Sequence, residues 1–325
     1  MKRVLITGAN GFIGRNISEY FLAKGYDVVC TYRSKKHQIN PNKSFIIGDM
    51  SLATSWETAL SGVDIVVHLA ARVHIKVDSV QEELNEYRKV NVDGTMALAT
   101  AAVKAGVKRL IYLSSIKVNG EGWMDSQHLP YTESCLAQAK DFYGISKYEA
   151  EQALLNFAHK AKLEVVIIRP PLVYGPEVKS NFLSMMKWLY KGVPLPLGSI
   201  HNHRSLVALD NLISFIETCM FHPAAVNQIF LVSDGEDLST TELLRRTSLA
   251  LGVSPRLIPI PIGVIMAMAS LLGKQELAHK LCASLRVDIS KACRLLNWAP
   301  PISIDQALKK TAHDFLNKNI NNHSC

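Results

Sequence analysis

The sequence lacks closely spaced cysteines. Its six cysteines are scattered over 325 residues, without the short paired spacings of a zinc site or the density of a disulfide framework. We therefore expect no bound metal and a reducing compartment, the cytoplasm. The amino terminus also lacks a signal-peptide core, because Met1-Lys2-Arg3 leads directly into a short apolar run and a glycine loop. We expect nothing to be cleaved or exported.

Long apolar runs and clusters of one charge are also scarce. The longest apolar stretch, residues 257–272, is shorter than the ~20 residues that cross a bilayer. We expect no membrane span, and a helix over residues 262–272 that is buried inside the domain or at a subunit interface such as that of a homodimer. The net charge of +8 comes without the basic runs and interleaved aromatics of a nucleic-acid-binding surface. We expect no nucleic-acid partner and assign the charge to attraction of polyanionic small ligands.

The first half of the chain alternates short β-branched runs with helical patterns. The predicted strands are 4–7, 28–32, 45–47, 65–69, 110–114 and 165–169, and the predicted helices are 12–24, 80–105 and 144–159. This alternation predicts an α/β fold, a Rossmann doubly wound parallel sheet. Beyond Arg169, prolines break the chain into short elements. We therefore predict a dinucleotide-binding domain over residues 1–170, with returns near 205–232, and a smaller C-terminal α/β substrate domain over residues 171–325.

Three glycines follow the first predicted strand and open a helix. Gly8, Gly11 and Gly14 permit a tight turn and let backbone N–H groups approach a pyrophosphate at the helix N-terminus. The end of the second predicted strand carries no carboxylate for the adenosine ribose, since Asp27 comes too early. Arg33, backed by Lys35 or Lys36, is placed to hold a 2′-phosphate instead. The pattern favours NADP(H), while NAD(H) stays open because an exposed arginine is often idle.

A second group of residues has acid–base character. Tyr143 and Lys147 are four residues apart and so share one helix face. An adjacent ammonium favours the phenolate of a tyrosine. Ser115 follows the strand predicted at 110–114, at the edge where open α/β sheets bind ligands. We predict Ser115, Tyr143 and Lys147 as the catalytic set.

Seven segments carry a family resemblance: TGANGFIG (7–14), HLAA (68–71), NVDGT (91–95), LSSIKVNG (113–120), YGISKYEAE (143–151), RPPLVYGP (169–176) and RSLVALDNL (204–212). Together they resemble the NAD(P)-dependent nucleotide-sugar epimerase/dehydratase/reductase family of extended short-chain dehydrogenases. The resemblance implies that Ser115 hydrogen-bonds the substrate, that Tyr143 is the general acid/base and that Lys147 is its electrostatic partner and holds the nicotinamide ribose.

The same resemblance implies further contacts. Beside the glycine loop and Arg33, the cofactor contacts are Phe12, Ile13, Asp49, Met50, Leu69, Ala70, Ala71, Arg72, Asn91, Tyr143, Lys147 and Pro170, with Asn91 bracing the long helix against a neighbouring loop. The substrate contacts, beside Ser115, are Lys117, Asn181, Phe182, Arg204 and Arg286. Two of these have a competing interpretation, Asn181 as an ordinary helix N-cap and Lys117 as a solvent-facing side chain. The family's C-terminal Arg-x-x-Asp pair is not in place, which leaves the phosphate contacts there open between Lys280 and Arg286.

The residues after Ser115 bear on the reaction. A 4,6-dehydratase of this family carries an Asp-Glu pair there, whereas this chain has Ile116 and Lys117, which argues against dehydration. The missing ribose carboxylate and Asn119, where a Tyr is usual, favour a C4 reductase of the UDP-N-acetylquinovosamine type. Its substrate is a UDP-4-keto-6-deoxy-N-acetylhexosamine, for surface polysaccharide synthesis. The alternatives are a UDP-glucose or UDP-N-acetylglucosamine 4-epimerase with bound NAD and, more remotely, a non-catalytic NADP-sensing protein.

Overall fold

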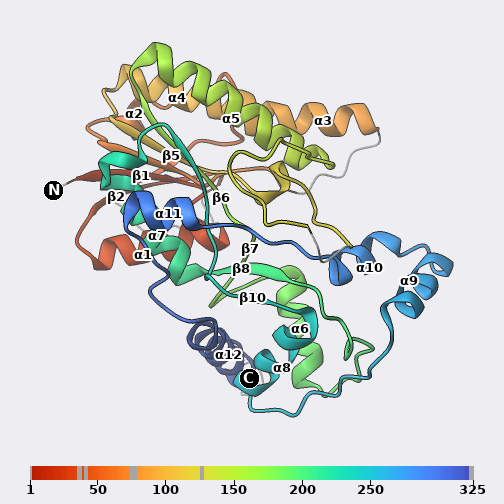
Figure 1. Ribbon diagram of the computed structural model, residues 1–325. Helices are drawn as coiled ribbons and strands as arrows, with labels where there is room; N and C mark the ends of the chain where they lie inside the picture. The colour runs from red at the N-terminus through yellow and green to blue at the C-terminus, as the bar shows by residue number, and fades with distance from the viewer. Residues whose placement is uncertain (1, 35–38, 40–42, 74–78, 125–127, 322–325) are drawn as a thin grey trace.

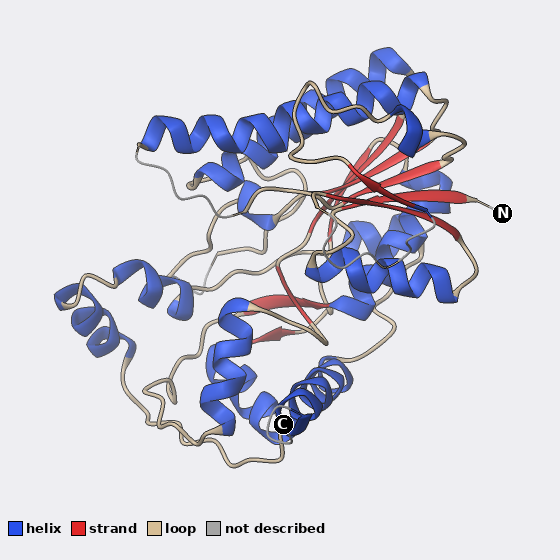
Figure 2. Cartoon of the chain, turned by 180° about the vertical axis from the view of Figure 1, so that it is seen from behind, coloured by secondary structure: helices blue, strands red, loops and turns tan. Residues whose placement is uncertain are grey.

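The architecture is a parallel sheet between two layers of helices, with a smaller lobe beneath it (Figures 1 and 2). The computed structural model describes residues 2–34, 39, 43–73, 79–124 and 128–321. Seven parallel strands have the order β3-β2-β1-β4-β5-β6-β9. They are β1 (Arg3–Thr7), β2 (Asp27–Tyr32), β3 (Ser44–Ile46), β4 (Ile65–His68), β5 (Arg109–Leu113), β6 (Glu164–Arg169) and β9 (Gln228–Leu231). The predicted Rossmann α/β class is confirmed.

Both faces of this sheet are buried, which explains its continuous apolar strands. In β1, Val4 and Ile6 point into one core and Leu5 into the other. The first core is covered by α1 (Phe12–Ala23), α7 (Leu209–Phe221) and α11 (Ser290–Leu296), and the second by α2 (Glu57–Leu60), α4 (Gly94–Lys104) and α5 (Phe142–Ala161). Because the seven strands are parallel, their carboxyl ends lie at one edge of the sheet, where the loops that follow them can carry ligand-binding groups.

The helix expected over residues 80–105 is interrupted. It consists of α3 (Val80–Arg88), a π-helical turn η2 (Lys89–Asp93) and α4. The extra residue in a π-turn shifts the side chains that follow, and such turns often mark functional sites. Here the turn carries the buried Asn91.

The smaller lobe has a sheet of its own. Its strands β7 (Leu172–Tyr174), β8 (Arg204–Ala208) and β10 (Asp237–Leu238) have the order β10-β8-β7. They share a hydrophobic core with α6 (Ser180–Tyr190), α8 (Thr240–Ala250) and α12 (Ile304–Asn321). Because β9 joins the large sheet and α7 covers it, the chain after residue 170 contributes to both sheets. The division into a cofactor domain and a substrate domain stays a prediction.

Two consecutive helices after α8 form a hairpin that projects from the smaller lobe (Figures 1 and 2). They are α9 (Ile262–Leu271) and α10 (Gln275–Cys282). A helix forms where it was expected, but only Ala269 of α9 is buried, so the expectation of burial inside the domain is wrong. Apolar composition indicates that a helix needs cover and does not indicate what provides it. Within the described ranges, no helix has the length and apolar character needed to traverse a bilayer.

Candidate active site

The glycine loop lies against the end of β4. Gly8 has φ +66°, and a Cβ there would lie 3.0 Å from the backbone of Ala70. A Cβ on Gly14 would lie 2.1 Å from the Gly8 carbonyl oxygen, closer than any side chain tolerates. Helix α1 begins directly behind, with Gly11 as an N-cap that offers no side chain. Only glycine permits this close approach, which leaves the backbone N–H groups of the turn and of the helix N-terminus to meet a phosphate.

A cleft of about 560 Å³ opens at this loop. Nine of the predicted cofactor residues line it: Gly8, Gly11, Arg33, Asp49, Met50, Leu69, Ala70, Ala71 and Arg72. Gly48, expected beside the adenine together with Asp49 and Met50, also lines the cleft, as do residues that were not predicted, Asn10, Thr31, Tyr32, Ile47, Val73 and Val90. Phe12, Ile13, Gly14, Asn91 and Pro170 lie outside this lining, and so do Tyr143 and Lys147. The glycine-lined approach fits the pyrophosphate of a dinucleotide, and the individual contacts stay predictions.

One carboxylate lies between two arginines at the mouth of this cleft. The Asp49 carboxylate lies 3.8 Å from Arg33 and 3.7 Å from Arg72. The Arg33 side chain is 73% exposed, so its guanidinium is accessible to a ligand. Lys35 and Lys36 fall outside the described residues. Asp27 is not available to a ribose, because it pairs with Arg3 and Lys43.

Asn91 connects the predicted cofactor cleft to the helix that carries the predicted catalytic residues Tyr143 and Lys147. Its side-chain oxygen accepts from the Arg72 backbone N–H at 2.8 Å, and its amide donates to the Arg72 carbonyl and to the Ser146 hydroxyl at 3.0 Å. The π-turn places this buried amide between the loop after β4 and α5. Asn91 therefore fixes the position of both segments without facing the cleft.

Tyr143 and Lys147 lie in the first turns of α5. The Asp141 carboxylate caps this helix by accepting from the Gly144 backbone N–H at 2.7 Å. A Cβ on Gly144 would lie 2.9 Å from the Lys117 carbonyl oxygen, so the first turn of α5 packs against the chain just after Ser115. Ser115 itself follows β5 and caps the short 3₁₀ helix η3 (Ile116–Val118). The structure thus brings the predicted Ser, Tyr and Lys to the carboxyl edge of the sheet.

Burial changes the proton affinities of two of these groups. Lys147 is 1% exposed, and burial lowers its pKa from 10.5 to about 7, opposed by the negative charge of Glu151. Burial is also the main cause that raises the pKa of the Tyr143 phenol, with smaller contributions from Asp141 and Tyr87. We expected an adjacent ammonium to lower the pKa of Tyr143, but in the protein without ligands burial raises it. Burial thus favours the neutral form of each group.

A buried ion pair joins α5, the helix of Tyr143 and Lys147, to β6. Arg169 donates from Nε and Nη2 to the Glu151 carboxylate at 3.0 and 2.5 Å, and from Nη1 to Asn119 Oδ1 at 3.0 Å. The Asn119 amide in turn donates to the Thr132 carbonyl. Asn119, which the sequence analysis interpreted as a reductase feature, thus completes the hydrogen bonding of a buried guanidinium.

Comparison with known proteins agrees with this geometry. The NAD dependent epimerase/dehydratase family matches residues 4–233. The chain belongs to this family. It is 43% identical over 321 residues, 98% of this chain and 97% of the relative, to a UDP-glucose 4-epimerase of Vibrio cholerae.

Two solved structures show the same fold. One is UDP-glucose 4-epimerase of Thermotoga maritima with UDP-glucose, with a TM-score of 0.74, 22% identity and coverage of 98% of this chain and 99% of that one. The other is the dTDP-glucose 4,6-dehydratase DesIV of Streptomyces venezuelae with NAD, with a TM-score of 0.75, 25% identity and 98% coverage of each chain. The protein is therefore an enzyme of the extended short-chain dehydrogenase/reductase type.

The predicted substrate residues differ from one another in exposure and in the contacts they make. Lys117 forms an ion pair with Asp141 and is not merely solvent-facing. Phe182 is 4% exposed and stacks on Tyr174 in the core of the smaller lobe, which leaves little of its ring for a ligand. Arg204 donates to the backbone carbonyls of Lys280 and Ala283.

The other two predicted substrate residues are nearer to open surface. Arg286 pairs with Asp237 at 2.9 Å. Asn181 is exposed and faces a hollow of about 620 Å³ beside Lys274 and Lys280. Because α6 begins at Ser180 with Lys179 as its N-cap, the helix-cap interpretation of Asn181 is wrong. Its role in substrate binding stays a prediction.

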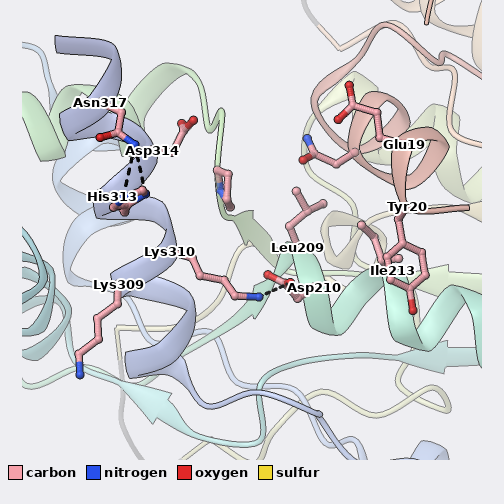
Figure 3. A pocket seen from close by; sticks show the side chains of 12 residues that line it. Glu19, Tyr20, Leu209, Asp210, Ile213, Lys309, Lys310, His313, Asp314 and Asn317 are labelled. Carbon is pink, nitrogen blue, oxygen red and sulfur yellow. Dashed lines mark hydrogen bonds and ion pairs between the residues drawn. The ribbon is translucent and has the colours of Figure 1, made fainter. Parts of the chain in front are cut away.

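A larger hollow of about 840 Å³ lies elsewhere, between α1, α7 and α12 (Figure 3). Its walls carry both charges, and Lys310 is already paired with Asp210 at 2.7 Å. None of the predicted cofactor, catalytic or substrate residues lines it. Size alone does not make this hollow the active site, because the glycine cradle lines the other cleft and the predicted acid–base groups Tyr143 and Lys147 lie on α5.

Proposed function

We propose that the enzyme epimerises C4 of a UDP-linked hexose with NAD that stays bound between turnovers. The observation that carries the proposal is the 43% identity, over nearly the full length of both chains, to a UDP-glucose 4-epimerase. The site chemistry supports it, since Ser115 is followed by Ile116 and Lys117, and the carboxylate of Asp141 near Tyr143 is engaged by Lys117 and by the helix cap. A 4-epimerase needs only a hydroxyl, a phenol and an ammonium beside the cofactor.

The chain's own residues supply the proton chemistry. The Tyr143 phenolate accepts the proton of the C4 hydroxyl as hydride leaves C4, and the phenol returns it when hydride adds to the other face of the resulting ketone. The Ser115 hydroxyl donates a hydrogen bond to that oxygen. In its ammonium form Lys147 stabilises the phenolate, and it holds the ribose. When bound, the nicotinamide ring accepts and returns the hydride.

A C4 ketoreductase that consumes NADPH is the second candidate. One observation favours it: Arg33 lines the cofactor cleft, is largely exposed, and contacts Asp49 only at 3.8 Å. A guanidinium in this position suits a 2′-phosphate. Its substrate is then a UDP-4-keto-6-deoxy-N-acetylhexosamine.

Two measurements on the purified enzyme separate the candidates. Nucleotide released by acid is identified by mass, and UDP-glucose or UDP-N-acetylglucosamine is incubated with the enzyme without added cofactor. Co-purified NAD and interconversion with the galacto epimer support the epimerase. Turnover of a 4-keto sugar that stops when NADPH is exhausted, with no epimerisation, establishes the reductase. Loss of both activities would favour the non-catalytic sensor.

A further inference from the structure

The hairpin of α9 and α10 exposes an apolar stripe at helical spacing. Helix α9 contains no charged residue. Val264, Met268, Leu271 and Leu272 follow one another at i, i+4, i+7 and i+8, so they share one face. These side chains belong to residues that are 47, 56, 87 and 67% exposed. In a globular helix this stripe is the face that is buried, yet here it points outward.

The opposite face of α9 is the one that packs. Ala269 of α9 and Ala278 of α10 are buried at their junction. Two further apolar residues of this region are exposed, Ile258 before α9 and Leu277 on α10, at 46 and 51%. We call these six residues, Ile258, Val264, Met268, Leu271, Leu272 and Leu277, the hairpin surface. The hairpin that carries this surface projects from the smaller lobe (Figures 1 and 2), and Leu277 also lines the hollow of about 620 Å³ at Asn181.

The segments around the hairpin surface are strongly cationic. Residues 179–200 and 251–283 contain six Lys or Arg and a single acidic residue, Glu276. All six cations are exposed: Lys179, Lys187, Lys191, Arg256, Lys274 and Lys280.

Two sets of contacts connect these segments. The Leu195 N–H donates to the Arg256 carbonyl, and the Ile258 N–H donates to the Leu195 carbonyl, which joins the loop after α6 to the segment before α9. At the other end of α6, Asn181 shares a hollow with Lys274 and Lys280. The exposed Trp188 lies two helical turns beyond Asn181 on the same face of α6. Aromatic side chains of this kind are enriched at membrane–water interfaces.

We propose that the hairpin surface docks the enzyme on an anionic lipid bilayer. An apolar helical face with flanking Lys and Arg is the pattern of a helix that lies in the membrane interface. At 10 residues, α9 is about 15 Å long, half of the ~30 Å hydrocarbon thickness, so it lies along the surface. A second copy of the chain would bring the same six cations together and oppose contact, whereas anionic headgroups complement them.

Docking in this way also orients the active site. The hairpin lies on the side of the molecule opposite the N-terminus, toward which the parallel strands run (Figures 1 and 2). Ser115 follows one of those strands. The carboxyl edge of the sheet therefore lies on the same side of the molecule as the membrane-facing hairpin. This consequence is independent of which sugar the enzyme uses.

The test is flotation of the full-length enzyme with vesicles of phosphatidylcholine, with and without phosphatidylglycerol. We expect binding to the anionic vesicles that is about tenfold or more tighter than to neutral ones and falls at high salt, because each juxtaposed cation contributes. Leu271→Asp should weaken binding by about tenfold or more, because it removes a buried leucine from the lipid. Leu249→Asp is the matched control, since Leu249 is 79% exposed on α8. Lys274→Glu should weaken binding more than Lys309→Glu.

Melting temperatures of the variants establish that each remains folded, and light scattering gives their mass. Retained binding in a folded Leu271→Asp variant overturns the proposal. So does equal weakening by Leu249→Asp, or failure of the wild type to bind anionic vesicles. If Leu271→Asp instead splits a dimer and no vesicle binding is found, the hairpin surface is an interface between two copies.

Discussion

The Lys147 ammonium lies 4.0 Å from the centre of the Tyr112 ring. Both residues are buried, one on α5 and one on β5. The electron-rich ring face and the charge of Glu151 stabilise the ammonium, each offsetting part of its desolvation. The offset is incomplete, because the pKa of Lys147 still falls to about 7. The candidate active site therefore holds a lysine whose pKa lies within the physiological range.

The variant Lys147→Met should reveal the lowered pKa of Lys147 through the pH dependence of protein stability. Between about pH 7 and 10.5 the unfolded chain binds a proton at this lysine that the folded chain has lost. The free energy of unfolding of the wild type therefore rises with pH across this window, and below pH 7 the cost of burying the charge is complete. The Met variant has no such term. Its melting temperature should exceed that of the wild type most near pH 7 and least near pH 10.

The control for this measurement is Lys309→Met, since Lys309 is exposed on α12. Its difference from the wild type should not change across the same pH range. A Lys147→Met difference that is equally constant would mean that the lysine stays protonated throughout.

Tyr143→Phe should lower kcat by about two to four orders of magnitude, the usual contribution of general acid–base catalysis. The ring and its contact with Tyr87 remain, so the melting temperature should change little. Steady-state rates with the sugar nucleotide and a thermal melt are sufficient. More than about a tenth of wild-type activity in the variant would contradict a proton-transfer role.

Gly14→Ala should disable the cofactor cradle. The new methyl group would lie 2.1 Å from the Gly8 carbonyl oxygen, so the loop must shift, at a cost of about 1–3 kcal/mol in stability. Gly263→Ala is the matched control, because a Cβ there meets nothing within 4 Å. In helix α9 it should stabilise by about 0.5–1 kcal/mol. Dinucleotide affinity, measured by calorimetry, should fall only in Gly14→Ala.

The sequence predicted the large sheet because burial on both faces leaves a local signal. Six strands with β-branched, apolar runs were located within about one residue of their observed bounds. The glycine loop and the Tyr143–Lys147 pair could also be predicted, because the spacing of these residues along the chain determines which of them lie on the same turn or helix face. The π-turn at Lys89–Asp93 could not be predicted. A π-turn differs from an α-helix by one inserted residue. The apolar residues before and after it keep helical spacing, so the sequence pattern does not indicate the insertion.

Other features depend on contacts between distant segments. The Glu151–Arg169 pair joins a helix to a strand, and no local pattern indicates which buried charges will meet. Asn119, which we interpreted from the sequence as a reductase feature, belongs to the same network. Helix α9 is a different case, because here the local pattern was predicted correctly and its surroundings were not. Its composition correctly indicated a helix, while the exposure of its outer face became visible only in the structure.

Arg33→Glu tests cofactor choice. If the guanidinium holds a 2′-phosphate, the variant replaces an attraction with a repulsion, and affinity for NADPH should fall about tenfold or more while affinity for NADH changes little. Asp49→Asn should act in the opposite direction, because it removes the carboxylate 3.8 Å from Arg33 that competes with the phosphate. Arg245→Glu, an equal charge change at an exposed position on α8, controls for the net charge of the protein. The deciding quantity is the ratio of the two dissociation constants for each variant. A ratio that Arg33→Glu leaves unchanged assigns Arg33 to the surface, removes the physical support for the reductase, and leaves the epimerase with bound NAD as the function of this site.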